Sequence, residues 1–421
     1  MIDLLERADR LWKGEIEMAK VSPMNHSGEI AEVVARTAFV PSFGNVSAFA
    51  TDQGLVLIDT GSRFFAAEVH RLVRGYSNQP LHTAVFTHGH VDHVFGMEPF
   101  DAEDGPRPRV VAHEKVVDRF QRYLKTAGYN GVINQRQFQL PNFKWPVDYR
   151  YPDEVFSEAM VLEIGGERFE LNHGRGETDD ASWAWIPSRK VLCCGDFFIW
   201  ASPNAGNPQK VQRYAGDWAV QLRRMADLGA EILLPGHGLP IVGAGRIRQS
   251  LGDAAELLES LERQTLALMN QGARLDEVIH AVKAPQHLLE LPYLKAVYDE
   301  PEFVVRNIWR LYGGWWDLNP ATLKPAAEAA LAGELAALAG GADALATRAR
   351  ELSQAGDHRL AGHLAEFASL AAPGDREVER ARSDVFAARA EAEKSTMSRG
   401  VFSWAASESR ARLQDGVEGD G

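Results

Sequence analysis

Three imidazoles and one carboxylate lie within six residues, directly after the apolar run 84–87; they are His88, His90, Asp92 and His93. Side chains this close in sequence cannot all share one face of a helix, whereas a loop can splay them. His88 and His90 can then face one metal ion, and Asp92 and His93 a second. Imidazole and carboxylate ligands without thiolate suit zinc, iron or manganese, and favour hydrolytic zinc chemistry. The fold must therefore hold a polar loop at the end of a buried strand, where a rigid scaffold usually places catalytic residues.

Short apolar runs punctuated by Gly, Pro and Asn continue from about residue 30 to residue 242, a pattern typical of short strands. Helical segments, such as 64–74 and 218–228, lie between them. Mixed strands and helices predict a layered α/β domain. The strands are expected at residues 54–61, 84–87, 109–112, 190–194 and 231–234.

The chain changes character after about Arg246, where helical spacing and Ala- and Leu-rich segments replace the strand pattern. A length of 421 residues also favours more than one domain. We therefore predict a catalytic domain over residues 1–248, an all-helical domain over 249–393, and a disordered tail over 394–421. The tail is polar, with Ser-rich and Gly-rich pieces that offer little to bury.

Composition argues against a nucleic-acid partner, a membrane span and a secreted protein. The chain carries 58 Asp and Glu against 45 Lys and Arg, and this net charge of -13 argues against nucleic acid. An anionic small substrate stays compatible, because a bound metal inverts the local field. No apolar stretch long enough to span a membrane is present, and residues 1–20 lack the apolar core of a signal peptide. The two cysteines, Cys193 and Cys194, are adjacent and form no disulfide framework, so we expect a cytoplasmic protein.

Further polar positions follow strand-like runs downstream. His173 and Glu177 lie in one Gly-rich segment, Asp196 follows Gly195, and His237 stands between two glycines. Each alone is a weak signal, because a Gly-Asp turn or a His between glycines is common in structural loops. The order of these polar positions, and the glycines that flank them, together make a functional site the better interpretation.

Taken together, these motifs resemble the ligand set of the metallo-β-lactamase superfamily, over about residues 33–242. The segments that carry the resemblance are His88-Gly89-His90-Val91-Asp92-His93, Gly176-Glu177-Thr178, Gly195-Asp196 and Pro235-Gly236-His237-Gly238. The resemblance implies a four-layer αββα sandwich with a two-metal site at one edge. It also implies that His88 and His90 bind the first ion, that Asp92, His93 and His237 bind the second, and that Asp196 bridges them.

One position departs from the commonest pattern of the superfamily, which has Gly-His-Thr where this chain has Gly-Glu-Thr. A carboxylate there is what alkyl sulfatases of the superfamily are expected to have, so Glu177 is predicted to complete the first ion's ligands. His173, four residues earlier, is the alternative ligand or a partner of a ligand. Asp59, at the end of a strand, can orient a ligand histidine.

The second region supports the same branch. Residues 305–320 look like the start of the alkyl-sulfatase dimerisation domain, and residues 340–343 and 355–361 resemble its later helices. After Ala321 alone, a generic Ala-rich helical bundle is the simpler interpretation. The resemblance implies a homodimer formed through the helical domain. Full alkyl sulfatases add a lipid-carrier-like domain for which this chain ends too soon, and this weakens the case for a long-chain alkyl substrate.

The predicted function is hydrolysis of a small ester, most specifically a sulfate ester, by water activated at two divalent ions, expected to be Zn²⁺. Asp92 and Asp196 are the carboxylates assigned to catalysis. Side chains that could bind the ester's anion follow Asp196 in sequence or lie in a helical segment near residue 135: Asn204, Asn207, Lys210, Arg213, Asn134 and Arg136.

Three alternatives stay open at this point. A carbon ester, lactone or thioester would suit the same metal motif. Related di-iron redox proteins are disfavoured, since they typically have Glu where this chain has His90, and they add a flavin-binding domain that is not recognised here. A non-catalytic metal-binding scaffold is disfavoured by the complete set of seven candidate ligands.

Overall fold

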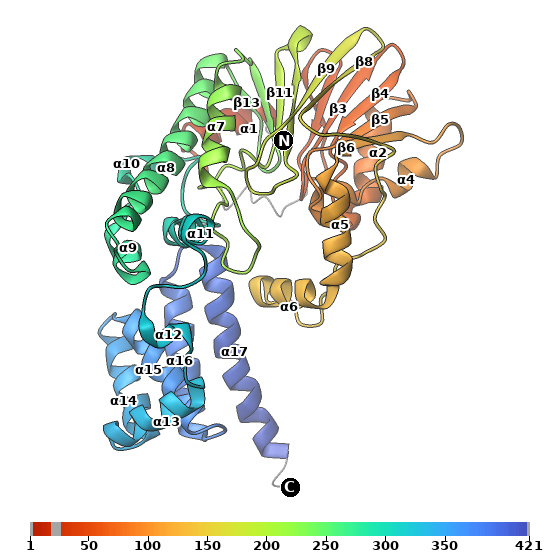
Figure 1. Cartoon of the computed structure of the whole chain (residues 1–421). Helices are drawn as coiled ribbons and strands as arrows, with labels where there is room; N and C mark the ends of the chain where they lie inside the picture. The colour runs from red at the N-terminus through yellow and green to blue at the C-terminus, as the bar shows by residue number, and fades with distance from the viewer. Residues whose placement is uncertain (1–2, 18–26, 419–421) are drawn as a thin grey trace. The chain divides into compact units, whose positions relative to one another are not determined.

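The computed structural model describes residues 3–17 and 27–418 and divides into two units. The first unit comprises residues 1–127 and 145–314, and the second comprises residues 128–144 and 315–421. Figure 1 traces the chain from one unit to the other by colour. The candidate metal ligands all belong to the first unit.

The first unit is built on two β-sheets (Figure 1). One has seven strands in the order β1-β2-β3-β4-β5-β6-β7, and the other has six in the order β13-β12-β11-β10-β9-β8. Phe49 and Phe169 meet edge to face between the sheets, with ring centroids 5.5 Å apart. The bounds are β1 Ala31–Val34, β2 Thr37–Val40, β3 Val46–Thr51, β4 Gly54–Ile58, β5 Leu81–Phe86, β6 Arg109–His113, β7 Glu154–Phe156, β8 Ala159–Ile164, β9 Glu167–His173, β10 Ser182–Ile186, β11 Val191–Gly195, β12 Ile232–Pro235 and β13 Ile241–Val242.

Helices cover the outer faces of both sheets: α2, α4 and α5 lie beside the first sheet, and α7 and α8 beside the second (Figure 1). Amphipathic spacing explains this cover, since α7 buries Trp218, Leu222 and Met225 on one face. The expected four-layer αββα sandwich is thereby confirmed. The bounds are α1 Leu4–Trp12, α2 Ala66–Tyr76, α3 Val91–Val94, α4 Glu98–Asp101, α5 Lys115–Lys125, α7 Ala215–Ala226, α8 Ala244–Asn270, α9 Leu275–Ala281, α10 Gln286–Leu289 and α11 Pro301–Gly313.

The structure contains strands at the predicted apolar runs. These runs are continuously apolar because both faces of the strands are covered. All five residues of β4 and all five of β11 are buried, as continuous apolar runs between two covered faces require. Strands β4, β5, β6 and β7 run parallel, and so do β11 and β12. Parallel strands have their carboxyl ends at the same edge of a sheet, so the loops that follow them gather there.

The structure differs from the predicted boundary at residue 249. Helix α8 begins at Ala244 and buries Leu251, Leu258 and Leu261, and it packs against α7 in the first unit. The first unit then continues to Gly314, because α11 also packs on α8. The second unit takes in residues 128–144 as well, which the sequence had placed within the catalytic domain.

The second unit is helical, as expected. Its helices are α6 Ala127–Phe138, which begins one residue before the unit, α12 Pro320–Leu323, α13 Glu328–Ala339, α14 Ala342–Gln354, α15 His358–Ala371, α16 Arg376–Ala392 and α17 Thr396–Glu418. Over residues 3–17 and 27–418, no single helix has the length and apolar character to cross a membrane. The bent pair α13 and α14 meets that test together, on length and composition alone.

The prediction of a disordered tail is wrong for residues 396–418, which form α17. Met397 and Ala406 are buried, and Arg382 of α16 donates to the Ala405 carbonyl at 2.8 Å and to Ser409 Oγ at 2.9 Å. Small and polar residues therefore hold this helix, where the sequence offered no strong apolar stripe. Residues 419–421 lie outside the described residues.

Candidate metal centre

The candidate ligands come from loops at the ends of strands. His88 and His90 follow β5, while Asp92 and His93 lie on α3, a single helical turn, rather than on an open loop. The other three ligands come from the second sheet: Glu177 lies between β9 and β10, Asp196 follows β11, and His237 follows β12. The two sheets thus each supply part of one cluster.

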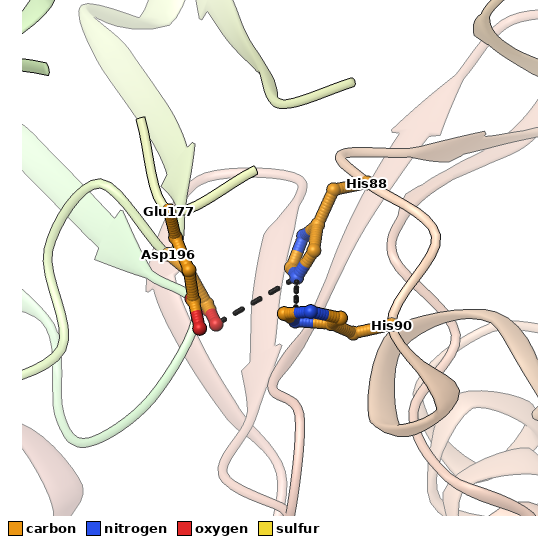
Figure 2. Close-up of side chains that lie close together, drawn as sticks. All are labelled: His88, His90, Glu177 and Asp196. Carbon is orange, nitrogen blue, oxygen red and sulfur yellow. Dashed lines mark hydrogen bonds and ion pairs between the residues drawn. The ribbon is translucent and has the colours of Figure 1, made fainter. Parts of the chain in front are cut away.

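The first group of donors is His88, His90, Glu177 and Asp196, whose ligand atoms all lie within 4.8 Å of one another. Figure 2 shows the two imidazoles facing the two carboxylates. His88 Nε2 lies 2.8 Å from His90 Nδ1 and 3.7 Å from Asp196 Oδ2. Two imidazole and two carboxylate donors at this spacing could hold one divalent ion.

The second group is Asp92, His93 and His237, which meets the same 4.8 Å limit. His237 Nε2 lies 3.4 Å from Asp92 Oδ2, and His93 Nε2 lies 3.6 Å from it. Asp196 also reaches this group, with Oδ1 3.4 Å from His93 Nε2 and Oδ2 3.4 Å from His237 Nε2. Asp196 is therefore the carboxylate between the two groups, where the sequence placed the bridging ligand.

A glycine is required beside this carboxylate. A Cβ at Gly236 would lie 2.1 Å from Asp196 Oδ1, far inside van der Waals contact. Any side chain there would displace either Asp196 or the His237 loop. The Pro-Gly-His-Gly motif thus has a steric reason at this position.

Asp59 holds the loop from behind. Its Oδ2 lies 2.8 Å from His93 Nδ1 and accepts from Thr87 Oγ1 at 2.8 Å, while its Oδ1 accepts from the Thr87 backbone N–H at 2.7 Å. The imidazole therefore presents Nε2 to the cluster. This is the orienting contact suggested for Asp59 from sequence.

Burial and neighbouring charges shift the pKa values of the imidazoles and of the bridging carboxylate in ways that favour metal binding. Burial, with a contribution from His93, lowers the pKa of His88 to about 4, and burial lowers the pKa of His90 well below its ordinary value. Both rings are then neutral near pH 7, with a lone pair free to bind a metal. Burial opposes ionisation of Asp196, but the neighbouring imidazoles His237, His93 and His88 hold its pKa well below the usual range.

The donor set fits divalent metal ions. Three ligand atoms are buried and have no hydrogen-bond partner among the described residues: His93 Nε2, Glu177 Oε2 and Asp196 Oδ1. Burial opposes a charge on His93, yet Asp196, Asp92 and Asp59 raise its pKa to about 10. The carboxylates thus create a strongly negative site that is lined by imidazoles. A divalent cation bound there would balance this charge and would give the three unpaired atoms a partner.

Glu177 divides its two oxygens between different partners. Arg213 Nη1 makes a buried ion pair with Oε1, and Asn204 Nδ2 donates to the same oxygen at 2.5 Å. Burial raises the pKa of Glu177 to about 7, and Arg213 counteracts that rise. Oε2 is the atom left for the first donor group.

The alternative ligand, His173, is not part of either donor group. Its Nε2 lies 2.9 Å from the Asp179 carbonyl, and its ring stacks on His113 with centroids 3.8 Å apart. Residues 173 and 177 were both open from sequence, and the structure brings only Glu177 to the first group.

The anion-binding candidates separate into three sets. Asn204 and Arg213 contact Glu177, and Asn207 is fixed by its own backbone N–H, which donates to Asp299 Oδ2 at 3.2 Å. Lys210 is half-buried, and burial and Arg213 lower its pKa to about 8 against the opposing charges of Glu177 and Asp92. Asn134 and Arg136 belong to α6 of the second unit, where Asn134 Nδ2 donates to the Asn130 carbonyl at 2.7 Å.

Two family models match the chain. One describes the metallo-β-lactamase superfamily and matches residues 40–237, and the other describes alkyl sulfatase dimerisation and matches residues 274–412. The chain is an alkylsulfatase-like protein with a metallo-β-lactamase-fold domain. The first match ends at His237 and so includes all seven candidate ligands.

Curated relatives support the alkyl-sulfatase-like assignment. A linear primary-alkylsulfatase of Pseudomonas sp. is 25% identical, over 75% of this chain and 64% of the relative. An (R)-specific secondary-alkylsulfatase of Pseudomonas sp. is 26% identical, over 81% of this chain and 56% of the relative. The chain thus spans about three fifths of the length of these relatives.

A 2,4-dinitroanisole O-demethylase subunit alpha of Nocardioides sp. is also similar, at 22% identity over 65% of this chain and 77% of the relative. Among solved structures, an inverting sec-alkylsulfatase of Pseudomonas sp. superposes with a TM-score of 0.80 and 23% identity, over 91% of this chain and 65% of that chain. That likeness shows a shared fold.

Sequence reasoning missed one buried pair beside the candidate ligands. Asp180 Oδ2 accepts from the Gly89 backbone N–H at 2.9 Å, between His88 and His90, and Arg119 Nε donates to Asp180 Oδ1 at 2.7 Å. Burial raises the pKa of Asp180, but Arg119 outweighs it and brings the pKa to about 2. The adjacent pair Asp179-Asp180 was the only signal, and nothing in the sequence linked it to Arg119.

Proposed function

We propose that the protein is a metal-dependent hydrolase of sulfate esters. The observation that carries this proposal is the position of Asp196 between two donor groups, the first of which is completed by a carboxylate, Glu177. The alkylsulfatase relatives support the same substrate class. Imidazole and carboxylate donors without thiolate favour Zn²⁺ as the metal.

In this proposal His88, His90, Glu177 and Asp196 hold one ion, and Asp92, His93, His237 and Asp196 hold the other. Two ions bound there would supply a hydroxide near neutral pH and would stabilise the charge that develops on the ester. Asp196 would set the spacing of the two bound ions, and it would accept the proton that the water releases when it becomes hydroxide. Asp92, whose Oδ2 lies 3.4 Å from His237 Nε2, is the second carboxylate that we propose to take part in catalysis.

Lys210 is the residue that we propose for binding the sulfate group. It is the candidate cation on which both Glu177 and Asp92 act, one from each donor group. Asn204 and Arg213 contact Glu177, and the Asn207 backbone N–H donates to Asp299. The ester's organic group is proposed to lie against Phe43 and Trp145, since Phe43 lies 6.1 Å from the His237 ring and 6.4 Å from that of Trp145.

A second candidate reaction is cleavage of a carbon ester or an aryl ether. The O-demethylase subunit is the relative of which this chain covers the larger share, 77%. The same donor groups suit water activation for either substrate. The choice therefore depends on substrate tests.

We further propose that the protein forms a homodimer through its second unit. The match to the alkyl sulfatase dimerisation model covers most of that unit. Substrate and partner are thus a small ester and a second copy of this chain.

The test pairs elemental analysis with substrate assays on the purified protein. We expect about two zinc ions per chain, sulfate release from short alkyl sulfates, and loss of both one ion and the activity in Glu177→Ala. Carbon esters, a lactone and a methyl aryl ether are assayed in parallel. Two ions with hydrolysis only of these other substrates would refute the sulfatase proposal and keep the metal centre; iron in place of zinc would refute the zinc proposal.

A further inference from the structure

The buried amide of Asn307, on α11, contacts both ends of the loop that carries Arg213. Asn307 Nδ2 donates to the Gly206 carbonyl at 2.7 Å, and Asn307 Oδ1 accepts from Gln212 Nε2 at 2.6 Å and from the Arg213 backbone N–H at 3.3 Å. One side chain therefore holds both ends of residues 206–213. Both the donor and the acceptor side of this amide are used.

The backbone of the loop at Gly206 packs directly against the backbone of α11. A Cβ at Gly206 would lie 2.5 Å from backbone atoms of Phe303 and Val304 on α11. Asp299, just before the helix, accepts from the Gly206 backbone N–H at 2.5 Å and from that of Asn207 at 3.2 Å. The loop thus lies directly on α11, with its peptide groups paired to side chains of that segment.

The other end of this chain of contacts is the metal centre. Arg213 Nη1 contacts Glu177 Oε1 and also donates to the Asn204 carbonyl at 2.7 Å, while Asn204 Nδ2 donates to the same Glu177 oxygen. Both groups occupy Oε1 and so turn Oε2 toward His88, His90 and Asp196. A shift of the loop would move away the two groups that donate to Oε1, Arg213 and Asn204, and would leave that oxygen free to rotate away from its present position.

We propose that Asn307 is a positioning residue for the metal ligand Glu177, and that it acts through Gly206, Gln212 and Arg213. Residues 274–412 match the dimerisation family model, yet α11 lies in the first unit and serves the metal centre there. The inference rests on the proposed metal centre and is independent of which ester is cleaved.

The test is a Zn²⁺ titration of the metal-depleted full chain, in competition with a chromophoric chelator and without any substrate. Asn307→Ala should weaken one of the two Zn²⁺ ions by about tenfold to a hundredfold, the usual effect of losing a residue that orients a ligand. The other ion, which Asp92, His93 and His237 hold together with Asp196, should keep its affinity. Arg306→Ala is the matched control, because Arg306 is the exposed neighbour of Asn307 on α11.

Two milder variants guard against a folding defect. Gln212→Ala removes one partner of Asn307 and should weaken the same ion less; Asn307→Asp keeps the acceptor for Arg213 and should fall between wild type and Asn307→Ala. Unchanged affinities in all three variants, or equal weakening of both ions, would overturn the inference. A sulfatase assay that fails while the titration behaves as expected would refute the substrate and leave Asn307 in its role.

Discussion

Arg119 and Asp180 illustrate how single buried residues determine the position of the metal-binding loop. The exposed fraction is 3% for Arg119 and 0% for Asp180. Their pair supports the Gly89 backbone N–H, so it fixes the peptide between the two imidazoles of the first donor group. A Cβ at Gly89 would lie 2.9 Å from Arg119 Cδ, which shows how closely the guanidinium stem approaches the loop.

We predict that Arg119→Met destabilises the protein by about 3–5 kcal/mol, because it leaves the Asp180 charge buried without its partner. Urea unfolding measures this change. Lys125→Met, an exposed position on the same helix, should change stability by less than about 0.5 kcal/mol. Similar small losses for both variants would contradict the prediction.

We expect Asp299, at the α11 attachment, to make the stability of the protein depend on pH. Burial raises the pKa of Asp299 to about 6, despite the N–H groups of Gly206, Glu300 and Asn207. A raised pKa means that the folded state binds the proton more tightly than the unfolded state. The contribution of Asp299 is therefore most favourable below about pH 4 and declines as the pH rises to about 6.

We predict that the difference in stability between wild type and Asp299→Asn changes across this window, by about 3 kcal/mol in total. The wild type should lose stability relative to the variant as the pH rises from about 4 to 6. Urea unfolding at several pH values measures it. A difference that stays constant over the window would show that Asp299 does not titrate there.

At the scale of elements, α17 is the part of the fold that sequence reasoning could not find. The strands were predictable, since β4 and β11 are continuous apolar runs. Helix α17 instead buries small residues, such as Ala406 and Ser409, and is held by Arg382 from the preceding helix. Small buried residues leave no apolar stripe in the sequence, and the composition of the segment suggested disorder.

The candidate site was predictable to the extent that its ligands follow strands. The seven candidate ligands were visible as motifs, whereas the choice between Glu177 and His173 depends on where the loop after β9 turns. Contacts between distant segments could not be inferred at all: Arg119 lies 61 residues from Asp180, and Arg213 lies 94 residues from Asn307. Periodicity reports local structure and carries no information on such pairs.

We predict that the backbone amides of residues 400–410 exchange slowly with deuterium, as expected of a packed helix. Arg382→Met removes the donors to Ala405 and Ser409 and should speed exchange in that segment. Amides of β4 and β11 in the first unit act as the internal reference and should not change. Fast exchange of residues 400–410 in the wild type would restore the prediction of a disordered tail.

At the scale of the whole molecule, we infer that α13 is the contact surface of the proposed homodimer. This helix is apolar on almost every side, yet only Ala332 and Ala336 are buried. Leu338 is 84% exposed and Leu331 is 47% exposed. A helix that is apolar around its whole circumference is normally covered, so a second copy of the chain is the partner that the dimerisation family model favours.

We predict that Leu338→Glu converts the dimer to a monomer, because a charge would have to be desolvated at the centre of an apolar contact. Light scattering after size-exclusion chromatography measures the mass, and elemental analysis should still find the wild-type metal content, since every ligand lies in the first unit. Leu124→Glu, at an exposed leucine of the first unit, should leave the dimer intact. If Leu338→Glu stays dimeric, the contact lies elsewhere on the chain; if the wild type is itself a monomer, the exposed leucines of α13 require a different partner.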